Sequence, residues 1–139
     1  MLSRKSAVKA VVDTNILVSG IFWGEKPEQV LNLWRNGELH LLVTKDILDE
    51  YLRVLGTLGY LDEDLVSDWT DHICKYSLMV LKTARIELCR DASDNKFLEC
   101  AISAHADCII SGDNDLLVLE TIQGIPILNP SQFLNRFIG

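Results

Sequence analysis

The chain alternates short, uninterrupted apolar runs with longer stretches in which apolar residues recur at helical spacing. Continuous apolar runs are typical of strands buried on both faces of a parallel sheet, and intervening helices indicate βαβ units. The predicted strands cover 8–12, 39–44, 79–82, 108–111 and 125–128. The predicted helices cover 27–36, 47–58, 62–78, 91–106 and 131–137. We therefore expect a three-layer α/β/α fold with a central, mainly parallel sheet of four or five strands.

The composition sets the class of protein. With 139 residues and no linker, repeat or low-complexity segment, the chain is expected to form one domain, residues 1–139. Its hydrophobic fraction of 48% excludes a disordered chain. No apolar run approaches the roughly 20 residues that span a bilayer. No C-x-x-C pair suggests a zinc site. We expect a cytoplasmic protein that makes no membrane contact.

The net charge of −7 argues against a protein that grips nucleic acid through a broad basic face. If the substrate is a polyanion, something other than lysine and arginine side chains must therefore neutralise its phosphates.

Acidic residues follow two of the predicted strands directly. Asp13 comes after the strand at 8–12, and Asp113 and Asp115 come after the strand at 108–111. Ligands of parallel sheets collect beyond the carboxyl ends of strands, so these acids are candidate site residues. The segment "SGDNDLL" is equally compatible with an ordinary turn, because Gly, Asp and Asn are the residues that turns use.

Two further acids are candidates on predicted helices. Asp94 falls near the centre of the apolar face of the helix at 91–106, where an unpaired carboxylate costs free energy unless it is compensated. Helix capping is the alternative role, although Asp91 alone can provide that cap. In the helix at 47–58, Asp49 and Glu50 flank the apolar stripe on opposite sides, and periodicity barely separates them.

Four segments taken in order resemble the PIN-domain nucleases, and most closely the bacterial PIN proteins classed as toxins of toxin–antitoxin systems. They read "VVDTNILVSG", "TKDILDEYLRVL", "RDASDNKFLECAISAHADCIISGDNDLL" and "IPILNPSQFL", and the likeness runs from about residue 8 to 137. It implies catalytic and metal-binding roles for four acids, Asp13, Glu50, Asp94 and Asp113. It also implies an auxiliary metal ligand, Asp115, and supporting polar residues at Asn15 and Ser111. Ala92 stands where close relatives usually carry proline.

The same resemblance implies a Mg²⁺- or Mn²⁺-dependent endoribonuclease acting on single-stranded or structured RNA. It implies a type II toxin with a cognate antitoxin as partner, and we also expect a homodimer. Crowded carboxylates repel one another, and one or two hard divalent ions would relieve that repulsion and activate a water. Two alternatives stay open. One is a phosphohydrolase with Asp13 as nucleophile, although Asn15 stands where that chemistry usually has a second acid. The other is a non-catalytic module that binds metal or RNA.

Overall fold

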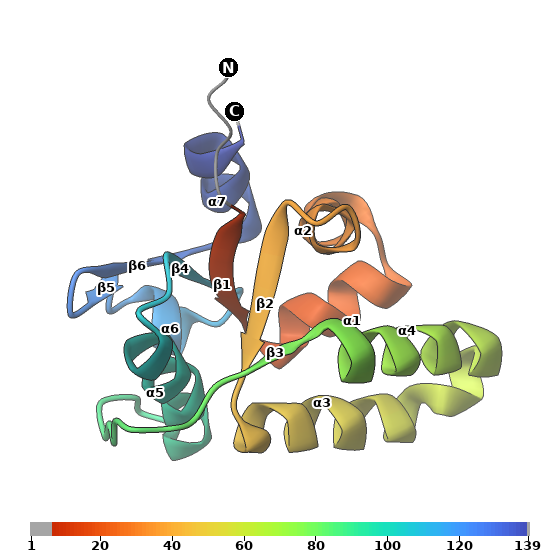
Figure 1. Ribbon diagram of the computed structural model, residues 1–139, viewed down its shortest axis with the longest axis horizontal. Coiled ribbons are helices and arrows are strands. Elements are labelled where there is room, and N and C mark those ends of the chain that lie inside the picture. Colours follow the sequence, from red (N-terminus) through yellow and green to blue (C-terminus); the bar gives the residue numbers. More distant parts are fainter. Residues whose placement is uncertain (1–6, 139) are drawn as a thin grey trace.

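The structure is a computed structural model that describes residues 7–138, and it places a central sheet among flanking helices (Figure 1). The six strands lie in the order β3-β2-β1-β4-β6-β5. Their bounds are β1 Val8–Val12, β2 Leu39–Val43, β3 Leu78–Met79, β4 Cys108–Ile110, β5 Thr121–Ile122 and β6 Ile125–Leu128. All neighbours pair in parallel except β5, which is antiparallel to β6. The predicted fold class is confirmed. The sheet has one strand more than the upper expectation, because the two-residue β5 is too short to show a sequence pattern.

Seven α-helices and two 3₁₀ turns accompany these strands in the described part of the chain. The helices are α1 Thr14–Phe22, α2 Glu25–Arg35, α3 Lys45–Leu58, α4 Glu63–Tyr76, α5 Asn95–Ala104, α6 Asn114–Leu117 and α7 Pro130–Phe137. The 3₁₀ turns are η1 Gly59–Leu61 and η2 Ala92–Asp94. The predicted helix at 91–106 therefore begins as a 3₁₀ turn, which Asp91 caps by accepting a hydrogen bond from the amide of Ser93.

Helix α1 has no counterpart among the predicted helices. It begins directly after β1 because the carboxylate of Asp13 accepts a hydrogen bond from the amide of Ile16 and caps the first turn. Helix α1 packs closely on α2 at Gly20, where a Cβ atom would lie 2.8 Å from the carbonyl oxygen of Pro27. A glycine is required there, since a side chain would push the two helices apart.

The direction in which the chain adds strands reverses at β1. From β1 it proceeds to β2 and β3 on one side, and it later returns to place β4 and β6 on the other side. The connections on the two sides of such a switch point leave a crevice at the carboxyl ends of the central strands, where ligands of α/β proteins bind. The crevice between β1 and β4 is therefore the expected location of a functional site.

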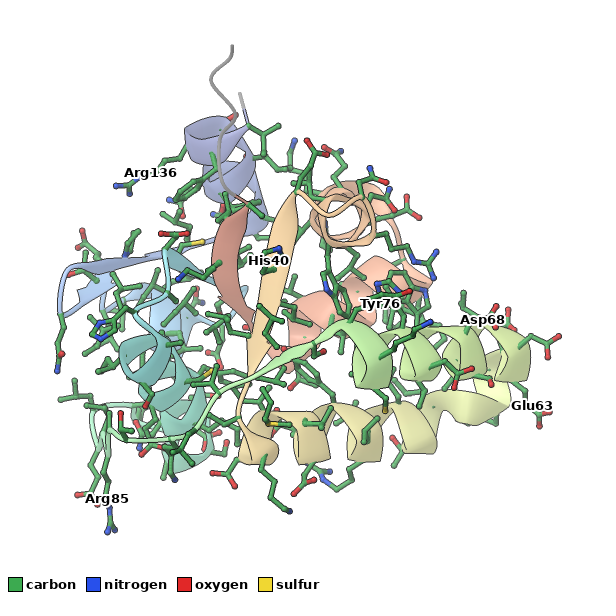
Figure 2. All side chains as sticks on the ribbon, in the orientation of Figure 1. His40, Glu63, Asp68, Tyr76, Arg85 and Arg136 are labelled. Carbon is green, nitrogen blue, oxygen red and sulfur yellow. The ribbon has the colours of Figure 1, made fainter. Side chains whose placement is uncertain are left out.

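Many charged side chains lie on the outer surface. Glu63 on α4, Arg85 in the loop before α5, and Arg136 on α7 point outward from the ribbon (Figure 2). Cys100 and Cys108 are buried free thiols. Within residues 7–138, no helix combines the length and the apolar character that crossing a membrane requires.

Candidate active site

Asp13 lies at the carboxyl end of β1 and is 4% exposed. Its Oδ2 accepts a hydrogen bond from the hydroxyl of Ser111 and another, at 3.2 Å, from the amide of Gly112. Its Oδ1 accepts the bond from the amide of Ile16, at 2.9 Å. Burial raises the pKa of Asp13, the three hydrogen bonds act in the opposite direction, and the nearby charge of Asp113 raises it further. The backbone around the switch point thus holds this carboxylate in a fixed orientation.

Asp94, Asp113 and Asp115 converge beside Asp13. One carboxylate oxygen from each of the three lies within 4.8 Å of the other two, and we call these residues the acid cluster. Ser111 links the cluster to Asp13, because its hydroxyl oxygen also accepts a hydrogen bond from the amide of Asp113, at 2.9 Å. Asp113 in turn caps α6 by accepting a bond from the amide of Asp115, at 2.8 Å. Local backbone geometry therefore orients these acids as well.

Asp94 carries a strongly perturbed carboxyl group. Its Oδ2 is buried and has no hydrogen-bond partner among the described residues. Desolvation, followed by the closeness and the negative charge of the Asp113 carboxylate, raises the pKa of Asp94 to about 7. A partly buried acid with an unsatisfied oxygen is unfavourable by itself, and a proton or a metal ion would relieve it.

Glu50 approaches from α3 and has partners of its own. The hydroxyl of Thr14 donates to its Oε2, and the ammonium group of Lys96 lies 2.6 Å from its Oε1. Partial burial raises the pKa of Glu50, but the contacts with Lys96 and Thr14 outweigh it, so the pKa is lowered overall. Asp49 points elsewhere and pairs with Lys45 at 2.7 Å in an exposed position. The geometry separates these two neighbours where periodicity does not.

Tyr51 holds α3 against the end of β1. Its ring is fully buried, and its hydroxyl donates to the backbone carbonyl of Val12. Burial, together with the charges of Asp13 and Glu50, raises the pKa of Tyr51 well above its ordinary value, so the phenol stays neutral. This contact fixes the position of the next residue back, Glu50, relative to Asp13.

Asp115 belongs to the acid cluster but also has a cation from the chain. Arg90 donates from Nε and Nη2 to the two carboxylate oxygens of Asp115, each at 3.2 Å. The side chain of Arg90 is 86% exposed, so the pair is screened by solvent. Asp115 can therefore turn towards a bound ion at small cost.

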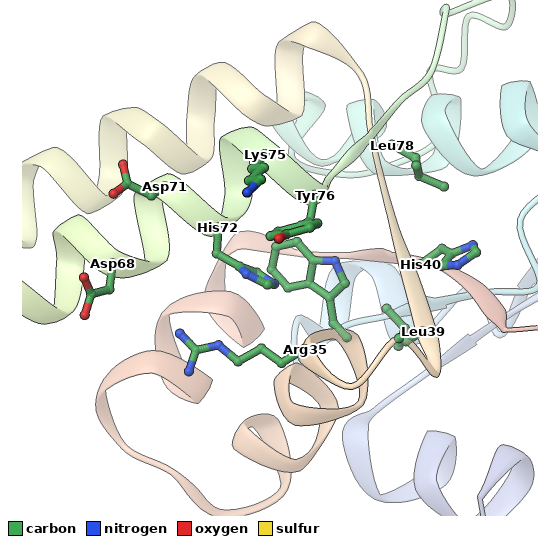
Figure 3. Close-up of a pocket in the computed structure, with 11 residues that line it drawn as sticks. Arg35, Leu39, His40, Asp68, Asp71, His72, Lys75, Tyr76 and Leu78 are labelled. Carbon is green, nitrogen blue, oxygen red and sulfur yellow. The ribbon is translucent and has the colours of Figure 1, made fainter.

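The structure has one cavity that borders these acids and another that lies away from them. One of about 740 Å³ borders the site, and its lining includes Cys89, Asn95, Lys96 and Glu99. A larger cavity of about 810 Å³ lies between α2, α4 and β2, with Trp34 among its lining residues, and contains none of the five acids (Figure 3). The five acids therefore lie outside this second cavity.

Comparison with known proteins places this arrangement in a family. A family model of the PIN domain matches residues 9–115, a span that contains all five acids. The chain belongs to the PIN-domain family. Members of this family are generally nucleases.

Two individual proteins are similar to this PIN-domain chain. "Uncharacterized protein MJ1680" from Methanocaldococcus jannaschii is 27% identical over 124 residues, which cover 84% of this chain and 78% of that protein. The crystal structure of VapBC2 from Rickettsia felis, bound to a DNA fragment from their promoter, matches with a TM-score of 0.59 at 13% identity. The match covers 88% of this chain and 98% of the other, and at that identity it establishes the fold.

The donor set of this PIN domain fits a divalent metal ion. The acid cluster offers carboxylate oxygens, which are the ligands that Mg²⁺ and Mn²⁺ prefer. The buried Oδ2 of Asp94 has no hydrogen-bond partner among the described residues, so it is free to act as a metal ligand. The identity of the ion does not follow from this geometry.

The structure brings only some of the sequence-predicted site residues together. Asp94, Asp113 and Asp115 come together, Asp13 lies beside them through Ser111, and Glu50 lies outside the 4.8 Å group. Asn15, predicted as a supporting residue, is exposed, and its side chain forms no hydrogen bond among the described residues.

The buried neighbour of Asn15, Thr14, makes the contact to Glu50 instead. Sequence reasoning missed the roles of Thr14, Tyr51 and Arg90. The available signal was the helical spacing of residues 16, 17, 20 and 21. A helix predicted from that spacing places Thr14 on the buried face.

Proposed function

We propose that this PIN-domain protein is a metal-dependent endoribonuclease that hydrolyses phosphodiester bonds of single-stranded or structured RNA. The observation that carries the proposal is the convergence of Asp94, Asp113 and Asp115, next to Asp13, at the switch point of a PIN-domain sheet. Such a cluster supplies the cation binding that an acidic protein needs before it can approach a polyanion. Mg²⁺ or Mn²⁺ are the proposed ions.

The residues divide the work as follows. Asp94 and Asp113 would hold the ion, with Asp115 as an auxiliary ligand once it releases Arg90. Asp13, fixed by Ser111, would complete the negative face of the site. A bound divalent ion supplies an activated water and neutralises charge on the phosphate. Glu50, held by its partners on α1 and α5, would help to orient the attacking water.

The alternative with Asp13 as a nucleophile fits this geometry less well. Both carboxylate oxygens of Asp13 already accept hydrogen bonds, and the residue is nearly inaccessible. A nucleophilic oxygen must be free to reach phosphorus. The observations therefore favour attack by water over a covalent intermediate.

We extend the proposal to the setting in which the enzyme acts. The fold is similar to that of VapBC2 from Rickettsia felis, which is bound to a DNA fragment from their promoter. By analogy, we propose that this chain is a toxin restrained by a cognate antitoxin and that it forms a homodimer. Trp23 is 66% exposed on the end of α1 and is available to such a protein partner.

Cleavage of labelled single-stranded RNA tests the proposed activity. We expect wild-type protein to cut RNA in Mn²⁺ and to be silent in EDTA. Asp94→Asn should lose at least about 100-fold in rate, because a ligand of the activating ion is gone. Asp49→Asn is the matched control and should keep wild-type activity, since Asp49 pairs with Lys45 on the exposed side of α3.

Three results would contradict the proposal in different ways. RNA binding with no cleavage in any metal would support the non-catalytic module. Cleavage that persists in EDTA would remove the metal dependence. Release of phosphate from phosphomonoesters, with RNA left intact, would support the phosphohydrolase.

A further inference from the structure

Lys96 is the least exposed cation at this site. It lies on α5, two residues after Asp94, and its ammonium group contacts Glu50 on α3 at 2.6 Å. Both side chains of this pair are only 18% exposed. In the other ion pairs of the described residues, at least one partner is 43% exposed or more. The pair of Lys96 and Glu50 is therefore shielded from solvent and not an incidental surface contact.

The negative charges of the site fall into two groups. The acid cluster brings three carboxylates within 4.8 Å, and its only cation in the described residues is the exposed Arg90. Glu50 lies outside that group and already has the ammonium of Lys96 on one oxygen and the hydroxyl of Thr14 on the other. One group therefore lacks a firmly held cation, and the other has one built into the chain.

A two-metal site needs carboxylates that are free to bind both ions, which lie about 4 Å apart. A lysine ammonium provides one positive charge as a compact, positionable point charge. When it occupies a carboxylate that would otherwise hold an ion, it removes both the ligand and the electrostatic need for that ion. Lys96 meets this condition at Glu50.

We propose that Lys96 is a positioning residue that takes the place of a second divalent ion, so that the site binds one metal ion per chain. The inference rests on the proposed metal-dependent function and deepens it. Lys96 holds Glu50 in position and neutralises it, and the acid cluster holds the single ion. Removal of the lysine charge should free Glu50 as a ligand and admit a second ion.

Mn²⁺ binding to the full chain tests this inference without any activity measurement. Titration followed by electron paramagnetic resonance counts bound ions and reports coupling between neighbouring ones. We expect one ion per wild-type chain with an uncoupled spectrum. Lys96→Gln should bind two ions per chain and show a coupled signal, because two ions about 4 Å apart interact magnetically.

Lys45→Gln is the matched control. It removes the same charge from another lysine–carboxylate pair, 2.7 Å from Asp49, outside the site. We expect one ion per chain in this variant, as in wild type. Lys96→Arg keeps the positive charge and should also bind one ion.

The outcomes separate this inference from the proposed function. Two ions in wild type, or one ion in Lys96→Gln, would overturn the role of Lys96 while leaving metal binding intact. No bound Mn²⁺ in any variant would overturn both the metal dependence and this inference. If Lys96→Gln does not fold by circular dichroism, Lys96→Met provides the uncharged variant, and the wild-type count still decides against the inference if it is two.

Discussion

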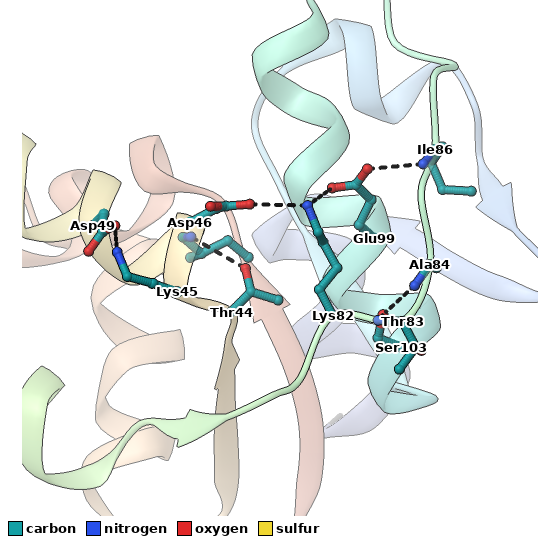
Figure 4. Close-up of polar contacts among 11 residues, drawn as sticks. Thr44, Lys45, Asp46, Asp49, Lys82, Thr83, Ala84, Ile86, Glu99 and Ser103 are labelled. Carbon is teal, nitrogen blue, oxygen red and sulfur yellow. Dashed lines mark hydrogen bonds and ion pairs between the residues drawn. The ribbon is translucent and has the colours of Figure 1, made fainter.

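Carboxylates gather in two regions of this protein, and the two gatherings differ in how their charge is compensated. In the acid cluster, Asp94 and Asp113 have no cation partner among the described ion pairs. In the second region, which we call the ion-pair cluster, Lys82 lies 3.4 Å from Asp46 and 3.5 Å from Glu99 (Figure 4). Acids with their own cations are typical of a structural contact, and acids without them are typical of a binding site.

Backbone donors deepen the contrast. Glu99 is 8% exposed, and its Oε2 accepts a hydrogen bond from the amide of Ile86 at 3.0 Å, which ties the loop before η2 to α5. Ser103 on the same helix accepts bonds from the amides of Thr83 and Ala84. The ion-pair cluster therefore holds the irregular segment at residues 83–86 against α5. In the acid cluster, by contrast, neighbouring carboxylates repel one another. Removing one acid from each region should change stability in opposite directions.

The largest expected change in stability is a loss at the ion-pair cluster. Glu99→Ala leaves the amide of Ile86 without its acceptor and Lys82 without its more buried partner. The hydrogen bond to Ile86 is partly buried. Leaving such a donor unpaired costs up to about 2 kcal/mol, so the free energy of unfolding should fall by about that amount. Urea denaturation measures the change.

Glu99→Gln is the control for this loss. It keeps an acceptor for Ile86 while removing the charge, so it should lose clearly less than the alanine variant. Equal stability of wild type and Glu99→Ala would mean that this region is no better fastened than the rest of the surface, and the contrast with the acid cluster would disappear.

The next effect has the opposite sign. Asp94→Asn should stabilise the metal-free protein at pH 8 by on the order of 1 kcal/mol, after allowance for solvent screening of a partly exposed group. The amide removes the charge that repels Asp113 and can donate a hydrogen bond to it. Thermal melts in EDTA measure the gain. A destabilised variant would contradict the view that Asp94 repels Asp113 in the metal-free protein.

The pH dependence of stability gives an independent check on Asp94. Its pKa is about 7 in the folded protein against an ordinary value of 3.8, so the folded state keeps a proton that the unfolded chain has released. The stability of the metal-free protein should therefore fall as the pH rises from about 4 to 7, and then level off. Melts from pH 5 to 8 should show this decline in wild type and a weaker one in Asp94→Asn. Identical pH profiles would remove Asp94 as the source of repulsion.

Asp13 shows why the sequence alone could locate this charge only in part. It predicts the acid at the end of β1, but the structure adds three hydrogen bonds that make Asp13 a helix cap as well. In Asp13→Asn, an NH₂ group at the position of Oδ2 would face the amide hydrogen of Gly112. Replacing Asp13 is therefore a less clean way to remove repulsion than replacing Asp94. The local sequence pattern predicts the position of Asp13. Its partners Ser111 and Gly112 are distant in the sequence, and only the fold brings them to it.

In the rest of the molecule, too, local patterns predict secondary structure better than they predict contacts between distant residues. The strands at 8–12 and 125–128 were predicted with the bounds they have, because buried parallel strands are short apolar runs. Helix α1 was missed because its β-branched residues and glycine resemble a continuing strand. The contact between Lys96 and Glu50 joins residues 46 positions apart, and no periodicity within either helix indicates it.

The smallest expected effect concerns Lys45, which has the same chemistry as Lys96 in a different environment. Its ammonium group lies 2.7 Å from Asp49, nearly as close as Lys96 lies to Glu50, but the two side chains are 83% and 58% exposed. Water and salt screen such a pair, and holding two long side chains together costs entropy. Lys45→Gln should therefore leave the urea midpoint unchanged within error, at low and at high salt. A clear loss of stability would mean that a short distance alone makes an ion pair matter in this protein, and exposure could then no longer separate Lys96 from the lysines of the surface.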